Sequence, residues 1–186
     1  AFLIAAFTWA LLDTFVIPHR ELIVSRARDV ADEVLETLVP SATLAAPQAA
    51  GASFYQDESM SVQLTTLRRD GTTCYVADVR LASPALLRTA LAENTFGRNV
   101  TDTVSELAGA NGAVPAINGD FYGSRKSGCC LRNGVLYRDT AASSATELLL
   151  VDASGDFSIA DDRTMTAGNA EGLWQIFSFG PALVTD

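Results

Sequence analysis

The chain has 186 residues, of which 48% are hydrophobic and 19% charged, and its formal net charge is −9. This length accommodates one modest globular domain and an additional segment. The acidic balance argues against a nucleic-acid partner, which needs a basic face, and the single His argues against a His-based triad or a His-rich metal site. We therefore expect no nucleic-acid partner, no metal and no other cofactor.

The first segment in chain order, Ala1–Pro18, is apolar on all faces and has the length of a short membrane span. It predicts an uncleaved signal anchor, that is, a single-pass transmembrane helix at the cell membrane with the following domain outside the cytoplasm. Asp13 within this span would be costly in lipid unless it lies near the interface. The alternative interpretation is an amphipathic helix buried in the domain.

Residues 19–53 predict an amphipathic helix followed by a linker. Apolar side chains recur at helical spacing over Glu21–Leu38, and Pro40 ends the pattern. The next stretch, Ser41–Ser53, is rich in small residues, Pro and Gly, which is typical of a linker. We therefore place the start of the folded domain at Phe54 and expect it to span residues 54–186.

The first half of this domain predicts a hairpin and two helices. Ser61–Leu67 and Thr73–Leu81 read as strands, and Asp70–Gly71 between them is a strong turn signal. Pro84–Glu93, with Pro at its first position, predicts a helix. A second, short helix is predicted over Thr103–Ala108, where Thr and Glu stand at capping-box spacing.

The second half predicts mainly strands. A short apolar run over Val114–Asn118 predicts a buried strand, and Cys130–Tyr137 predicts a hairpin around an Asn-Gly turn. Three further strands are predicted over Glu147–Asp152, Phe157–Ala160 and Gly172–Val184. Strands dominate, so we predict an α+β fold with a mixed, mainly antiparallel sheet and two inserted helices.

The three cysteines leave two possibilities open. Cys74 could pair with either Cys129 or Cys130, which would suit an extracellular domain. Alternatively, all three are reduced and partly buried. A catalytic thiol would need a basic partner that lowers its pKa, and no His is nearby in the sequence.

The loop after the Val114–Asn118 strand has the composition of a ligand-binding loop. If the strand continued, Asn118 and Asp120 would point to the same face. The carboxylate could act as an acid, base or nucleophile, and the amide could hold a sugar hydroxyl. Arg125 and Arg132 could bind a phosphate in a bidentate manner. The structural alternative is a simple turn, with Asp120 as its cap and the neighbouring aromatic side chains in the core.

Three motifs, AVPAINGDFYG, GCCLRNGVLYRD and FSFGPALV, resemble those of the phosphodiester glycosidase family in the same order. The resemblance runs from about Phe54 to the end of the chain. It implies hydrolysis of the bond between the anomeric carbon of a sugar and a phosphodiester. Members of the family release N-acetylglucosamine from such diesters, and many bacterial members are associated with exopolysaccharide. The implied partner is therefore a sugar phosphodiester or a polysaccharide.

The resemblance also implies positions for the site residues. Asn118, Gly119, Asp120 and Tyr122 would line the site, Arg132, Asn133 and Gly134 would lie on the adjoining hairpin, and Ser178–Gly180 on a facing strand. Asp120 and Asn118 are the predicted catalytic residues. Arg125 would bind the phosphate, and the remaining residues named in this paragraph would bind the rest of the substrate. The family pattern continues with an Asp-Gly-Gly-Gly-Ser-like segment that this sequence lacks, so we expect the domain to be incomplete at its C-terminus. The alternative function is a non-catalytic, cell-surface glycan-binding module.

Overall fold

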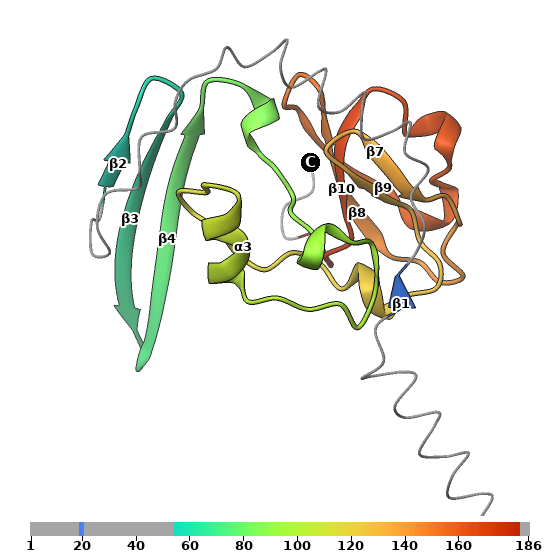
Figure 1. Ribbon diagram of the computed structural model, residues 1–186, viewed down its shortest axis with the longest axis horizontal. Coiled ribbons are helices and arrows are strands. Elements are labelled where there is room, and N and C mark those ends of the chain that lie inside the picture. Colours follow the sequence, from blue (N-terminus) through green and yellow to red (C-terminus); the bar gives the residue numbers. More distant parts are fainter. Residues whose placement is uncertain (1–18, 21–53, 183–186) are drawn as a thin grey trace, which may run out of the picture.

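The computed structural model describes residues 19–20 and 54–182, which form mainly antiparallel strands and, within these ranges, one α-helix (Figure 1). The class predicted for the domain is confirmed at this level. The predicted anchor over residues 1–18 and the predicted helix and linker over residues 21–53 lie outside the described residues. In the part that is described, no helix is long and apolar enough to cross a membrane.

The short strand β1, His19–Arg20, pairs antiparallel with β5, Gly97–Arg98. These residues belong to the range 19–53, for which the sequence predicted an amphipathic helix and a linker and no strand. This pairing joins the start of the described chain to the middle of the domain.

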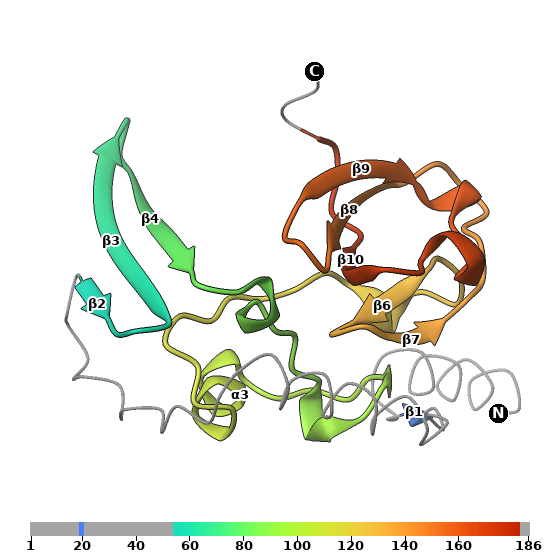
Figure 2. The same cartoon turned by 90° about the horizontal axis from the view of Figure 1, so that it is seen from above.

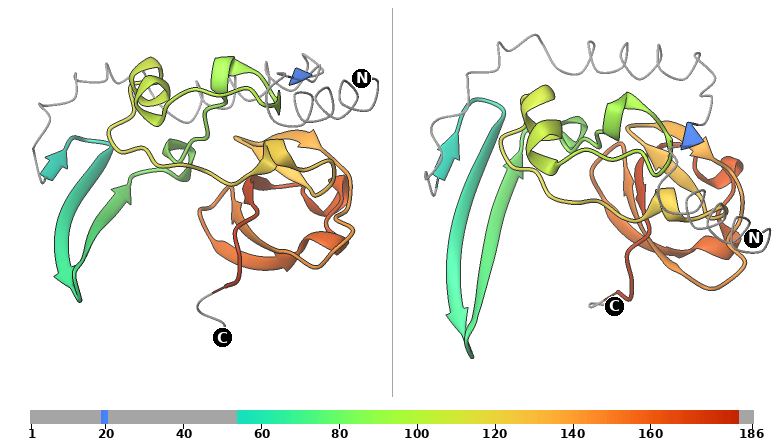
Figure 3. Two further views of the ribbon diagram at one scale, coloured as in Figure 1. Left: turned by 90° about the horizontal axis from the view of Figure 1, so that it is seen from below. Right: turned by 60° about the horizontal axis from the view of Figure 1, so that its bottom comes forward.

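The first sheet has the order β2-β3-β4 and consists of Phe54–Gln56, Met60–Arg69 and Thr72–Leu81. The β3–β4 turn is the predicted one, because Asp70 and Gly71 both have positive φ, 49° and 77°, as a two-residue hairpin turn requires. Most of this hairpin is solvent-exposed on both faces. Figure 3 shows it projecting away from the other sheets.

The predicted short helix is α3, Val104–Ala110, and it begins with the predicted capping box. The N–H of Glu106 donates to Oγ1 of Thr103 at 3.2 Å, and the N–H of Thr103 donates to Oε2 of Glu106 at 3.0 Å. These two bonds satisfy donors that the first helical turn leaves unpaired.

The predicted helix over Pro84–Glu93 is wrong, because only two 3-10 turns form there, at Pro84–Leu86 and Ala92–Asn94. Side chains from other elements occupy the backbone groups that a helix would need. The carbonyl of Leu87 accepts hydrogen bonds from the indole N–H of Trp174 at 2.8 Å and from the amide of Gln175 at 2.9 Å. Tertiary contacts therefore override the local helix propensity.

The predicted buried strand over Val114–Asn118 is also wrong. Residues 113–121 contain no strand, and Ile117 is 89% exposed. Pro115 in this run has no N–H to donate to a strand ladder. The loop that follows is instead fixed by side-chain contacts.

The second sheet has the order β10-β8-β9 and consists of Leu173–Phe177, Glu147–Asp152 and Phe157–Asp161. The hairpin of β6, Cys130–Arg132, and β7, Val135–Arg138, packs against it through β6 and β10. Figure 2 shows these five strands curling around a common centre. The core there is formed by Cys129, Leu131, Leu148, Met165, Ala170 and Ile176.

Further 3-10 turns form at Tyr122–Ser124, Asp162–Thr164 and Ala167–Asn169. The last strand is shorter than the predicted Gly172–Val184, since β10 ends at Phe177. Ser178 and Gly180 therefore follow the strand and do not lie in it.

Candidate functional site

A buried ion pair between Asp120 and Arg132 holds the predicted site loop against the second sheet. Nη2 of Arg132 lies 2.5 Å from Oδ1 of Asp120, and the two side chains are 2% and 5% exposed, respectively. The other carboxylate oxygen, Oδ2, accepts the backbone N–H of Ser178 at 2.6 Å. Asp120 thus joins the irregular segment before it to β6 and to the end of β10.

The guanidinium of Arg132 is enclosed by acceptors and aromatic rings. It donates to the carbonyls of Ile176 and Leu131, and its central carbon lies 4.9 Å from the ring centre of Phe177 and 5.8 Å from that of Tyr122. Burial is the main cause that raises the pKa of the Tyr122 hydroxyl. This phenol therefore stays neutral near pH 7 and is suited to packing and hydrogen bonding.

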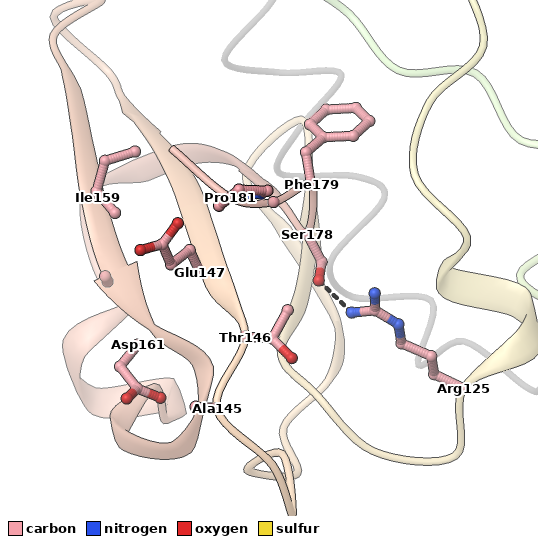
Figure 4. Close-up of a pocket in the computed structure, with 11 residues that line it drawn as sticks. Arg125, Ala145, Thr146, Glu147, Ile159, Asp161, Ser178, Phe179 and Pro181 are labelled. Atoms are coloured by element: carbon pink, nitrogen blue, oxygen red, sulfur yellow. Dashed lines mark hydrogen bonds between the residues drawn. The ribbon is translucent and has the colours of Figure 1, made fainter. Parts of the chain in front are cut away.

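An open groove of about 770 Å³ lies next to this ion pair, a volume within the range of ligand pockets. Arg125 and the segment Ser178–Pro181 line one side, and the first residues of β8 and the last of β9 line the other (Figure 4). Arg125 donates from Nη1 to Oγ of Ser178. Hydrogen bonds and ion pairs therefore connect Arg132, Asp120, Ser178 and Arg125 in that order.

Arg138 fixes the loop that carries Arg125. Its guanidinium donates to the carbonyls of Tyr122 at 3.1 Å, Arg125 at 2.9 Å and Gly128 at 2.7 Å. Charge-assisted bonds to both ends of one loop restrict its movement. The position of Arg125 in the groove consequently depends on a residue of β7.

Two carboxylates that the sequence analysis did not include also line the groove, Glu147 and Asp161. They are cross-strand partners on β8 and β9, so they share one face of the sheet. Hydrogen bonds from the side chain and N–H of Arg163 lower the pKa of Asp161, and the N–H of Ala182 donates to Oε2 of Glu147 at 2.5 Å. The strand boundaries were predictable from the sequence, but the pairing register that brings these acids together was not.

The other predicted site residues lie apart from the groove, with the exception of Gly180, which lines it. Asn118 and Gly119 are exposed. Asn133 has a structural network: its Oδ1 accepts from the N–H of Thr89 at 2.9 Å and from Gln175 at 2.7 Å. Gly134, with φ of 73°, completes the turn and donates its N–H to the carbonyl of Trp174 at 2.8 Å.

The chain matches no protein-family model, no curated protein and no solved structure. In the ranges that the structure covers, no three His, Cys, Asp or Glu side chains are grouped so that they could hold a metal ion.

The cysteines, all three within the described residues, are thiols and form no disulfide. Cys74 is exposed on β4, whereas Cys129 is buried in the core of the second sheet and Cys130 is buried with Leu91 and Phe96. Burial is the first cause, and the Asp162 carboxylate the second, that raise the pKa of the Cys129 thiol to about 11. Of the two possibilities left open by the sequence, the structure therefore has the one in which all three cysteines are reduced.

Treatment of the native protein with iodoacetamide at pH 8 is expected to modify Cys74 and to spare Cys129. Alkylation requires an accessible thiolate, and Cys129 is both buried and, at this pH, almost fully protonated. Mass spectrometry of peptides, with a sample unfolded in urea as the control, measures the outcome. Equal modification of both residues in the native protein would contradict the burial of Cys129.

Proposed function

We propose that the protein hydrolyses a sugar-1-phosphodiester, as a membrane-anchored enzyme of the phosphodiester glycosidase type whose substrate binds in the groove. The main support for the proposal is the position of Arg125. This guanidinium lines the groove, and among the described residues no carboxylate lies within ion-pair distance of it. An unpaired cation in a groove of an acidic protein is suited to a phosphate ligand. The three sequence motifs that resemble those of the phosphodiester glycosidase family suggest the class of reaction, hydrolysis of a sugar-1-phosphodiester.

The roles we propose follow from what each side chain contacts. Asp120 is a positioning residue, because both of its oxygens accept hydrogen bonds from Arg132 and Ser178. Arg125 binds the phosphate. Asn118, the other residue predicted to be catalytic, is exposed and does not line the groove, so it has no part in the proposed reaction.

The proposed chemistry needs a carboxylate in the groove that is not held in an ion pair within the described residues, for which we propose Glu147. Water attacks the anomeric carbon and gives a proton to this carboxylate. The bond from that carbon to the phosphate oxygen breaks, and its electron pair leaves with the phosphate, whose charge Arg125 balances. Phosphate monoesters have a second pKa of about 6, so the leaving group needs little help from an acid. The products are the free sugar and a phosphate monoester.

Membranes that carry the full chain are expected to release N-acetylglucosamine from a methyl phosphodiester of that sugar or from its uridine diphosphate ester. The substitution Arg125→Met should raise KM by roughly 10- to 100-fold, because it removes hydrogen bonds from a charged donor. Chromatographic detection of the free sugar measures both results.

Lys126→Met is the matched control, since this neighbouring cation is exposed and does not line the groove; its KM should match that of the unmodified protein. The proposal fails if the unmodified protein releases no sugar from either ester, or if Arg125→Met leaves KM unchanged.

The commitment of Asp120 to protein contacts also favours a second candidate, the non-catalytic glycan-binding module. The two differ in the effect of Glu147→Gln. Loss of a general base should lower kcat by about 10²- to 10⁴-fold, whereas a binding module would retain an anionic polysaccharide and release no sugar with either residue.

A further inference from the structure

The groove also carries apolar side chains. They are Ile159 on β9 and Phe179 and Pro181 in the segment after β10, which we together call the apolar wall (Figure 4). Ile159 is 50% exposed and Phe179 48%. Phe179 stacks on Phe177, with ring centres 5.7 Å apart, and is held in place by that contact.

The register of the second sheet explains why Ile159 faces outward. Leu148 and Ala160 are cross-strand partners, and both belong to the core of this sheet. The next pair, Leu149 and Ile159, must point to the opposite face, because successive side chains alternate. An isoleucine at this outer position therefore contributes nothing to that core and remains available to a ligand.

The groove thus combines two kinds of surface. Arg125 lies at one side and offers a cation without a carboxylate partner in the described ranges. Ile159 of the apolar wall lies on the opposite side next to Glu147, whereas Phe179 and Pro181 lie on the segment that also carries Ser178 (Figure 4). Such a surface complements an amphiphile whose anionic head is joined to an apolar chain.

We propose that the group attached to the phosphate of the substrate is a long-chain alcohol, so that the ligand of the groove is an alkyl phosphate. The sugar and its hydrolysis in this inference rest on the proposed function. The binding of the phosphate and of the alkyl chain does not depend on that function. Arg125 binds the phosphate and the chain lies along the apolar wall. Each methylene that becomes buried there contributes about a fourfold gain in affinity at most.

The test compares methyl phosphate with decyl phosphate, below the concentration at which the latter forms micelles, by isothermal titration calorimetry on the full chain. Decyl phosphate is expected to bind more than about tenfold more tightly. Ile159→Ser should lower the ratio of the affinity for decyl phosphate to that for methyl phosphate to roughly threefold or less. Arg125→Met should weaken the binding of both phosphates.

Leu67→Ser is the matched control, because Leu67 is an aliphatic residue of the β3–β4 hairpin whose exposure, 51%, is close to the 50% of Ile159. It should leave the ratio unchanged. Circular dichroism shows whether Ile159→Ser is folded; if it is not, Phe179→Ser replaces it. Equal affinities for the two phosphates, or an equal loss of ratio in Leu67→Ser, would overturn the inference.

Hydrolysis of the methyl and decyl phosphodiesters of N-acetylglucosamine separates the two proposals. If both are hydrolysed with equal kcat/KM, the proposed function stands and the apolar aglycone is wrong. If neither is hydrolysed but decyl phosphate binds through Ile159, the proposed reaction is wrong and the alkyl phosphate site stands.

Discussion

The substitution Asp120→Asn is expected to lower the free energy of unfolding by about 3–5 kcal/mol, the usual cost of breaking a buried ion pair. Both oxygens of Asp120 accept hydrogen bonds, one from Arg132 and one from the N–H of Ser178. An amide can replace only one of these acceptors, so a donor would face a donor. The positive charge of Arg132, whose side chain is 2% exposed, would also lose its counter-ion. Urea unfolding followed by tryptophan fluorescence measures the difference.

The same substitution at an exposed pair is the control. Asp78 lies 3.9 Å from Arg80, and their side chains are 64% and 81% exposed, so Asp78→Asn should change the stability by less than about 0.5 kcal/mol. Replacing both members of the buried pair, Asp120→Leu with Arg132→Met, should recover part of the loss, because no uncompensated charge remains. A loss below about 1 kcal/mol in Asp120→Asn would show that water reaches Arg132.

Replacing Gly128 by Ala is expected to cost about 2–4 kcal/mol, from two effects that add. The backbone of Gly128 has a φ of 95°, which is unfavourable for any residue with a Cβ. A Cβ atom there would also lie 2.6 Å from Oδ2 of Asp162, a buried carboxylate. Asp162 cannot move away freely, because its Oδ1 accepts the N–H of Cys129 at 2.8 Å. Thermal or urea unfolding measures the loss.

Gly172→Ala separates the two effects. Gly172 has a similar φ of 80°, but no atom lies within 4 Å of the position of its Cβ, so only the backbone strain of about 1–2 kcal/mol applies. The difference between the two variants is the cost of the close contact with Asp162. Equal losses would mean that the loop around Gly128 relaxes and avoids this contact.

The variants at Asp120 and Gly128 test two different sets of contacts that position Arg125 in the groove. Asp120 holds Ser178, which in turn accepts a hydrogen bond from Arg125. Gly128 lies in the loop that Arg138 binds, and the same guanidinium holds the carbonyl of Arg125. Milder substitutions at either position should therefore disturb the groove through the placement of Arg125, before they unfold the protein.

Local signals in the sequence were sufficient where the backbone itself decides the conformation. Both two-residue turns, Asp70–Gly71 and Asn133–Gly134, have the positive φ values that these residues tolerate best. The capping box at Thr103 and the strand Glu147–Asp152 also form at the predicted positions. Each of these depends on atoms within a few residues, so the sequence determines it.

The candidate site required contacts between residues far apart in the chain. The carbonyl of Leu87 accepts hydrogen bonds from side chains of β10 and not from a helical turn of its own. Residues 113–121 form no strand, and Asp120 at their end has its partners on β6 and after β10. Glu147 and Asp161 face the groove only through the pairing register of β8 and β9. Residue types therefore indicated an acid, an amide and guanidinium groups near one loop. Which of them is buried in an ion pair and which lines the groove was decided by packing, since the cost of burying a charge depends on the partners that the folded chain brings to it.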